Sequence, residues 1–396
     1  MASPGEETEE EAEFRASVRA ELAGILGTPS PDRGLNFLGA GSDDLGEGRS
    51  FLGSLAGGGW MVPAWPVEHG GRGSSPEEAG IIAQELSRFA RPDLYPFMVG
   101  LGMVGPVVLT HGTAEQRGRW LPAIRSGAEI WCQLFSEPDA GSDLAALSTR
   151  AVRDGDAWRV TGSKVWSSRA HYSRWGLLLA RTDPAVPKHA GITTFALDMG
   201  SPGIEVLPLR QMNGDAHFNQ VFLTDTPVFD GDRIGAEGDG WRVAITTLTH
   251  ERGSLGGGFG PGRDQLIGLA RGSGRTGDPV VRQRLAQVIT ELELIRQTGA
   301  RARAAARQGR RPGPEGSGAK LRGSSAMKEL ADLALDLEGA AGLVGTGEWQ
   351  TLFLTSPSLS IRGGTDEIQR NILAERVLGL PAEPRLDKGP PGTGSQ

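Results

Sequence analysis

The sequence predicts an α+β fold, mainly α-helical, in which a helical region comes first, a small β domain follows and a helical bundle comes last. Apolar residues recur with a helical period up to about residue 126, with a strand period over residues 127–238, and with a helical period again from residue 239. The 396 residues exceed the size at which one hydrophobic core stops growing. We therefore expect domains over residues 1–126, 127–238 and 239–381, and a flexible tail over 382–396.

Composition excludes several classes of protein. Hydrophobic content of 38% with 22% charged residues is typical of a soluble globular chain, and the formal charge of −7 argues against a nucleic-acid partner. The single cysteine, Cys132, and 6 histidines leave no internal disulfide and little chemistry for a metal. No apolar run reaches membrane-spanning length, and the first residues are acidic where a secretory signal is basic. We expect a cytoplasmic protein with no membrane partner.

The first third reads as helices joined by loops. Four apolar residues share one helical face, namely Phe14, Val18, Leu22 and Ile25. This helix is expected to end near Gly27, and residues 36–59 are rich in glycine. Residues 60–73 form an irregular run that we interpret as a loop. Ser75 and Glu78 then form a capping box that begins a helix, and two further helical segments are expected over 97–109 and 115–125.

The middle third changes to a strand pattern. Short β-rich runs cover residues 129–135, 151–158, 158–166, 174–181, 191–197, 204–210 and 219–224. A turn at Asp154 and Gly155 is expected within the run 151–158. The pattern favours an antiparallel barrel or sandwich whose inner face carries alternate residues.

The last third returns to a helical period. A helix begins at Gly240, and a glycine-rich run at residues 253–262 should bend or fray it. Apolar stripes predict helices over residues 282–307, 320–337 and 365–377. Residues 312–318 read as a flexible connection, and the pair Gly363-Gly364 precedes the last helix.

One stretch combines residue types that no helix or strand needs together. Residues 131–144 read WCQLFSEPDAGSDL, where a proline after Glu137 breaks regular structure. Gly141 and Ser142 offer free backbone N–H groups and a hydroxyl, which suit a phosphate. The stretch can be a strand that leads into a loop for a flat, phosphorylated cofactor, or an ordinary strand and tight turn. Spacing alone leaves both interpretations open.

Five motifs in this order resemble the acyl-CoA dehydrogenase family over nearly the whole chain: WPVEHGGRG, GTAEQRGRWLP, SEPDAGSD, TGSKVWSS and IRGGTDEIQRNILAERVLGLP. The resemblance implies that family's fold, with an N-terminal helical domain, a β-barrel-like middle domain and a C-terminal four-helix bundle. It also implies bound FAD, an acyl-CoA or carrier-bound thioester substrate, and an electron acceptor such as an electron-transfer flavoprotein. A homotetramer or dimer is expected, and a heterotetramer is compatible with the family.

The resemblance assigns the first wall of the FAD site. Gln133, Phe135 and Ser136 match positions that line the pyrimidine side of the flavin. The Ser136 hydroxyl would donate toward the N5 region and stabilise negative charge on the reduced flavin. Gly141 and Ser142 would contact the pyrophosphate.

Further cofactor contacts come from more distant segments. Trp166 and Ser168 match the second flavin wall, although without the family they read as a packed aromatic and an exposed hydroxyl. Thr365 and Glu367 match positions after the Gly-Gly pair that contact FAD.

Two more positions match contacts with a neighbouring subunit's FAD, namely Glu338 and Gly342. Many members hold that pyrophosphate with an Arg-x-Thr-Phe cluster, which here reads ARGSGRTGDP. Arg271 or Arg275 would replace its arginine, and the spacing does not decide between them.

The catalytic base is the most informative departure from the family pattern. The reaction removes a proton from Cα of an acyl thioester and a hydride from Cβ, so it needs a positioned carboxylate. Most members carry a glutamate where this chain has Gly363. The branch that includes the isovaleryl and long-chain enzymes instead carries it on the first helix after the β domain, where this chain has Glu251. Arg252 would then line the pocket, and the Gly363 amide N–H would donate to the thioester carbonyl.

Alternatives remain at this stage. By itself, Glu251 beside Arg252 is an ordinary solvated helix pair, and His250 is structural. The leading hypothesis is an FAD-dependent dehydrogenase that forms a trans-2-enoyl thioester. A monooxygenase or oxidase on the same fold is a second hypothesis. A third is a non-catalytic subunit that completes a partner's flavin site.

Overall fold

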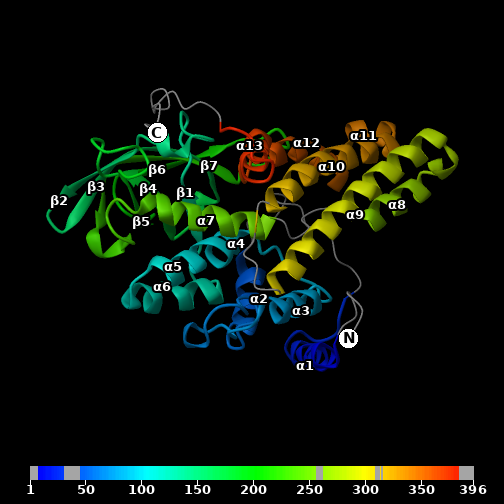
Figure 1. Ribbon diagram of the computed structural model, residues 1–396, viewed down its shortest axis with the longest axis horizontal. Helices are drawn as coiled ribbons and strands as arrows, with labels where there is room; N and C mark the ends of the chain where they lie inside the picture. The colour runs from blue at the N-terminus through cyan, green and yellow to red at the C-terminus, as the bar shows by residue number, and fades with distance from the viewer. Residues whose placement is uncertain (1–7, 31–44, 256–261, 308–312, 314, 383–396) are drawn as a thin grey trace, which may run out of the picture.

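A computed structural model describes residues 8–30, 45–255, 262–307, 313 and 315–382 (Figure 1). The predicted tail therefore lies outside the described residues except for Ala382. Helices form the lower part of Figure 1, a sheet forms the upper left, and a second helical group extends to the right. The order helix, sheet, helix agrees with the expected fold class. The boundaries after residues 126, 238 and 381 stay predictions.

The N-terminal region consists of α1 (Glu9–Leu26), α2 (Leu45–Ala56), α3 (Pro76–Leu86), α4 (Tyr95–Val99), α5 (Gly105–His111) and α6 (Ala114–Ser126). The predicted capping box is confirmed, because Glu78 N donates to Ser75 Oγ and Ser75 N donates to the Glu78 carboxylate. Helix α2 was not predicted in the glycine-rich segment. Leu52 and Leu55 on this helix are fully buried, so burial of its apolar face offsets the poor helix propensity of its glycines.

The predicted helix over residues 97–109 is divided into three parts. A π-helical turn, η2 (Gly100–Val104), joins α4 to α5. At Gly105 the backbone passes close to the Trp65 indole, where an added Cβ would lie 2.1 Å from Cζ2. This turn packs against α7 (Gly240–Leu255), so the irregularity lies beside the helix that carries Glu251.

The β domain is one sheet with eight strands in the order β6-β7-β3-β2-β4-β5-β8, and β1 pairs with β4. The strands are β1 (Trp131–Leu134), β2 (Arg150–Asp154), β3 (Ala157–Ser168), β4 (Trp175–Arg181), β5 (Ile192–Asp198), β6 (Ile204–Leu209), β7 (Phe218–Phe229) and β8 (Arg233–Ile234). The expected turn is present one residue later, because Asp154 still pairs with Ala157 and the turn consists of Gly155 and Asp156. The expectation of purely antiparallel pairing is wrong, because β1 and part of β2 pair with β4 in parallel.

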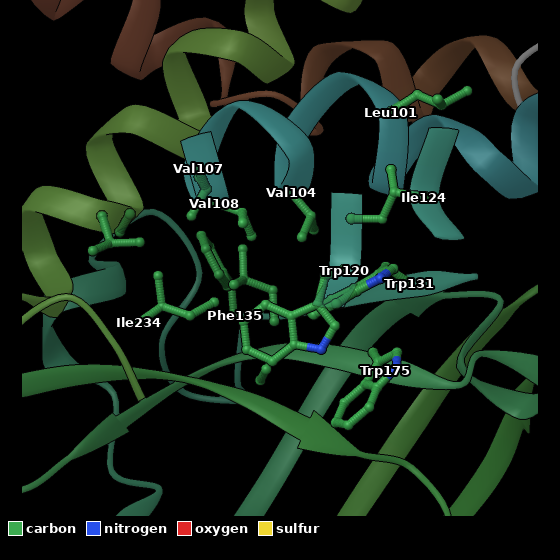
Figure 2. Packing of buried hydrophobic residues seen from close by; sticks show 14 of the residues in the cluster. Leu101, Val104, Val107, Val108, Trp120, Ile124, Trp131, Phe135, Trp175 and Ile234 are labelled. Carbon is green, nitrogen blue, oxygen red and sulfur yellow. The ribbon is translucent and has the colours of Figure 1, made fainter. Parts of the chain in front are cut away.

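Alternate residues of β4 point to two different cores. Leu177 and Leu179 face a cluster shared with the helices, whereas Leu178 and Ala180 face a cluster within the β domain. Figure 2 shows the shared cluster, where strands meet α5 and α6. Because β4 is buried on both faces, the site next to it rests on a rigid base.

The C-terminal region consists of α7, α8 (Arg263–Gly272), α9 (Pro279–Arg307), α10 (Glu315–Glu338), α11 (Ala340–Val344), α12 (Glu348–Thr355) and α13 (Asp366–Arg376). Helices α8, α11 and α12 were not predicted. The expected flexible connection at 312–318 is partly wrong, since α10 begins at Glu315, while residues 308–312 and 314 lie outside the described residues. Of the glycine-rich run, residues 256–261 also lie outside them.

In Figure 1, α7 runs below the sheet, and α13 lies between the sheet and α10. The three regions therefore meet at α7, which packs against η2 and α5 of the N-terminal region, β5 of the sheet and α10 of the bundle. Among the described residues, no helix is long and apolar enough to span a membrane.

Candidate active site

Strand β1 is anchored by an aromatic cluster that fixes the start of the motif at residues 131–144. Trp131 stacks on Trp175 with ring centroids 5.7 Å apart, and Trp120 contacts both rings edge-on (Figure 2). Phe135, which follows the strand, is only 4% exposed and packs in the same cluster. Its side chain therefore supports the loop from behind, while Gln133 and Ser136 stay half-buried.

A buried carboxylate closes the loop that follows. Four donors converge on Glu137: Ser148 N at 2.6 Å, Ser148 Oγ at 2.8 Å, Thr149 N at 2.9 Å and Lys164 Nζ at 2.8 Å. Glu137 also exchanges backbone hydrogen bonds with Ala140. Residues 137 and 148, the two ends of the loop, are thus tied together by one side chain.

The charge of Glu137 is strongly favoured. Burial opposes ionisation of this carboxyl group, but the Lys164 charge and the hydrogen bonds from Lys164, Thr149 and Ser148 outweigh it and lower the pKa of Glu137 to about 2. The Lys164 side chain is fully buried. Burial lowers the pKa of Lys164 to about 8, so both groups are still mainly charged at pH 7.

Between its closed ends, the loop presents open backbone. Gly141 and Ser142 are exposed, and a Cβ added at Gly141 would meet nothing within 4 Å. The loop has room on this side for a group that approaches the backbone closely, as the phosphate interpretation requires.

Strand β3 places an aromatic side chain beside this loop. A register shift between Lys164 and Ser167 turns the chain, and Trp166 adopts φ +60°, which is unusual for a bulky residue. Its indole is 60% exposed and meets Phe218 edge-on at 5.9 Å. Ser168, two residues later, is half-buried. A strained, exposed aromatic residue is typical of a binding wall.

The segment before α13 carries the second group of predicted site residues. Gly363 and Gly364 have φ of +69° and +89°, which L-residues with side chains rarely adopt. Their carbonyl groups accept hydrogen bonds from Gln369 Nε2 at 3.2 Å each. Thr365 caps α13 by accepting from Ile368 N at 3.2 Å. Glu367 in the first turn is exposed.

A second buried carboxylate supports this turn. Asp366 accepts from Lys320 Nζ at 2.8 Å and from Ser324 Oγ at 2.9 Å, both on α10. Burial raises the pKa of Asp366, but these hydrogen bonds prevail and lower it overall. The start of α13 is therefore fixed to α10.

Glu251 lies on α7 and acts electrostatically on this turn. It is half-buried, and its negative charge acts on Arg362, the residue before Gly363. Burial lowers the pKa of Arg362, and the electrostatic influence of Glu251 and Tyr95 opposes that effect. The Nε of Arg362 is buried and has no hydrogen-bond partner among the described residues. The structure thus brings Glu251 and the Gly363 segment together, whereas the Arg252 side chain lies outside what the structure describes.

Sequence reasoning missed three residues at this junction: Tyr95, Arg169 and Arg362. Arg169 is 2% exposed, lies over the Tyr95 ring at 5.1 Å, and donates to Tyr172 Oη at 2.8 Å. A cation directly before the Gly-Gly pair was a readable signal for Arg362. Arg169 and Tyr95 carried none, because their proximity arises only when α4 packs against the end of β3.

The residues predicted to reach a neighbouring subunit lie elsewhere. Glu338 ends α10 and accepts from Gln350 Nε2 at 2.6 Å, and Gly342 is buried in α11. Arg271 is exposed on α8, whereas Arg275 is engaged by Asp336. Figure 1 shows α8 and α11 at the end of the bundle away from α13 and the sheet. Within one chain, these residues therefore lie on elements distant from those that carry Ser136, Trp166 and Gly363.

The arrangement fits a flat, phosphorylated redox cofactor. The exposed Trp166 indole follows Val165, which hydrogen-bonds Ser136 at the start of an open glycine loop, and a capped helix N-terminus begins α13 in another region. The fold and the site together define a flavin-dependent oxidoreductase with a helical, a β and a second helical domain.

Comparison with known proteins identifies the family. Residues 8–128, 132–225 and 238–378 match the N-terminal, middle and C-terminal domains of acyl-CoA dehydrogenase, respectively. The chain is 40% identical to acyl-CoA dehydrogenase IpdE1 of Mycolicibacterium smegmatis over 390 residues, which cover 94% of this chain and 98% of that protein. The chain belongs to the acyl-CoA dehydrogenase family.

Other relatives extend this result. Acyl-CoA dehydrogenase FadE34 of Mycobacterium tuberculosis is 44% identical over 334 residues, which are 83% of this chain and 46% of that protein. The solved "Tcur3481-Tcur3483 steroid ACAD" is 29% identical, with a TM-score of 0.81 and coverage of 96% and 100% of the two chains. The ChsE4-ChsE5 complex from Mycobacterium tuberculosis has 27% identity, a TM-score of 0.75 and the same coverage.

These relationships establish the reaction. The chain is an FAD-dependent enzyme that dehydrogenates an acyl thioester between Cα and Cβ to give the trans-2-enoyl product. The same comparisons confirm the expected cofactor, FAD.

Proposed function

We propose that Glu251 is the base that removes the α-proton of the substrate. The observation that supports this assignment is that the Glu251 carboxylate is near enough to raise the pKa of Arg362, the residue before Gly363, which has no side chain of its own. Its half-buried position favours a reactive carboxylate over a fully solvated one.

The surrounding groups have complementary roles in this proposal. The proton moves from Cα to the Glu251 carboxylate, while the N–H of Gly363 donates to the thioester carbonyl oxygen, where negative charge develops. Arg362 stabilises the resting carboxylate through its opposite charge. When bound, FAD supplies the acceptor for the hydride that leaves Cβ. Ser136 and Trp166 orient the acceptor, and Gly141, Ser142, Thr365 and Glu367 contact its other parts.

The Glu251→Gln variant tests the base. Glutamine keeps the size of the side chain but cannot accept the proton, so anaerobic flavin bleaching by a thioester should slow by about 10²–10⁴-fold. FAD affinity should not change. His250→Gln, on the neighbouring position of the same helix, is the matched control and should bleach at the normal rate. Unchanged bleaching in Glu251→Gln would reject the assignment.

We infer that the acyl group is bulky. The similarity to the steroid enzyme "Tcur3481-Tcur3483 steroid ACAD" supports this substrate class. The carrier, CoA or a carrier protein, is an additional variable. The same bleaching assay with straight-chain and polycyclic acyl-CoA thioesters tests whether the acyl group is bulky. We expect a higher kcat/KM for the polycyclic thioesters. A higher kcat/KM for the straight-chain thioesters would contradict the proposal.

We propose that the working enzyme is an oligomer that passes electrons to an electron-transfer flavoprotein in the cytoplasm. Leu343 and Val344 on α11 are 83% and 85% exposed, and Glu338, Gly342 and Arg271 lie away from the site of their own chain. In an oligomer, these residues would contact a neighbouring subunit or its FAD. Light scattering of the purified chain, alone and with a second related chain, measures the assembly. A monomer with full FAD occupancy and turnover would exclude this requirement.

A further inference from the structure

Hydrogen bonds hold residues 135–137, where the flavin loop begins, on strand β3. Val165 N donates to the Ser136 carbonyl at 2.9 Å, and Lys164 Nζ donates to the Phe135 carbonyl at 3.1 Å. The same ammonium reaches Glu137 at 2.8 Å. Three successive residues of the loop are therefore held by two successive residues of the neighbouring strand.

The far end of the loop is held as firmly. Glu137 accepts from both the Ser148 and the Thr149 backbone amides. Arg181 of β4 donates to the Ala145 and Leu147 carbonyls at 2.6 and 3.1 Å. The loop thus closes on one carboxylate, and the exposed Gly141 and Ser142 lie between its fixed ends.

From this geometry we propose that Glu137 and Lys164 are positioning residues, which hold the loop at residues 138–147 and the Trp166 wall in the arrangement that binds FAD. Lys164 lies two residues before Trp166, and Glu137 directly follows Ser136, so one ion pair joins the two flavin walls. The inference rests on the proposed placement of FAD along these walls and does not depend on Glu251. Preordering the loop reduces the entropy lost when the cofactor binds.

The test replaces both charged side chains, Glu137 and Lys164, by uncharged ones. Removing Lys164 alone would leave a buried carboxylate unpaired and can prevent folding. The double variant Glu137→Gln/Lys164→Met removes both charges, while glutamine offers a single acceptor oxygen in place of two. The variant Lys164→Arg keeps the positive charge and should retain most of the FAD affinity of the wild type.

Two measurements on the full-length chain decide the question. Hydrogen exchange of the apoprotein should show loss of protection at the Ser148 and Thr149 amides in the double variant. Titration of apoprotein with FAD should show a Kd at least about tenfold higher, or about 1.4 kcal/mol, and an altered flavin absorption spectrum. Glu85→Gln is the matched control, because Glu85 is equally buried but bonds Arg19 at 2.9 Å in the N-terminal region.

The outcomes are distinct. Loss of amide protection together with weaker FAD binding, both absent in Glu85→Gln, supports the proposal. An unchanged FAD Kd in the folded double variant overturns it, as does unchanged exchange at Ser148 and Thr149. An error in the Glu251 assignment would alter only the turnover experiment, so the two proposals fail separately.

Discussion

The two sides of the proposed flavin site are built by different means. The β-domain side depends on a side chain, because Glu137 gathers four donors and its partner Lys164 is fully buried. The C-terminal side depends on the backbone, because two successive glycines at positive φ form the turn before α13. Both sides use a carboxylate and a lysine that are distant in sequence, by 27 residues for Glu137 and Lys164.

The corresponding pair at the C-terminal side is less enclosed. Asp366 and Lys320 are separated by 46 residues, and their side chains are 9% and 15% exposed. Water can therefore partly replace a lost contact there but not at Lys164. The comparison indicates that charge is critical on the β side and that backbone conformation is critical on the C-terminal side.

The largest effect is expected from Lys164→Met. This change leaves the buried Glu137 carboxylate without its cation, which costs about 3–5 kcal/mol of unfolding free energy. Denaturant unfolding followed by circular dichroism measures it. The double variant Glu137→Gln/Lys164→Met should recover most of the loss. A loss in Lys164→Met no larger than about 1 kcal/mol, typical of an exposed pair, would contradict the role given to charge.

Gly364→Ala should have the next largest effect. The added Cβ would meet Gln369 Nε2 at 2.6 Å and would have to adopt φ +89°, so we expect a loss of about 1–3 kcal/mol. Gly141→Ala is the control for stability, since a Cβ there meets nothing within 4 Å. Equal melting temperatures for the two variants would show that the backbone conformation at Gly364 is not critical for stability.

Asp366→Asn should cost less, about 1–2 kcal/mol, because Asn still accepts a hydrogen bond and Lys320 can turn toward water. The measurement is again the unfolding free energy, with Glu367→Gln as a control at an exposed neighbouring position. If Asp366→Asn proved as damaging as Lys164→Met, the two sides would not differ as described.

The smallest effect concerns pH. The pKa of Glu137 is lowered from 4.5 to about 2, so its contribution to stability is complete above pH 4.5 and is lost as the pH falls through 2. At pH 4, about 1 kcal/mol of this contribution to the unfolding free energy has been lost. Wild type should therefore lose about 1 kcal/mol more stability between pH 7 and pH 4 than the double variant Glu137→Gln/Lys164→Met does. Parallel pH curves for both proteins would show that Glu137 is not the linked group.

Local patterns were sufficient for much of the fold. The order of helical and strand regions follows from hydrophobic periodicity, and the capping box of Ser75 and Glu78 follows from spacing. The motif at residues 131–144 and the vacant Gly363 were also readable, since each depends on neighbouring residue types. Helix α2 was not, because its stability comes from burial of Leu52 and Leu55 against distant segments.

The sequence by itself therefore determined the family, the flavin-loop motif and the candidate base. Only the tertiary structure decided which charged groups meet. The parallel pairing of β1 with β4, the contact of Lys164 with Glu137 and the approach of Glu251 to Arg362 each join segments that no local pattern connects. The physical reason is that periodicity and capping act over a few residues, whereas desolvated charge pairs form only when packing excludes water from both partners.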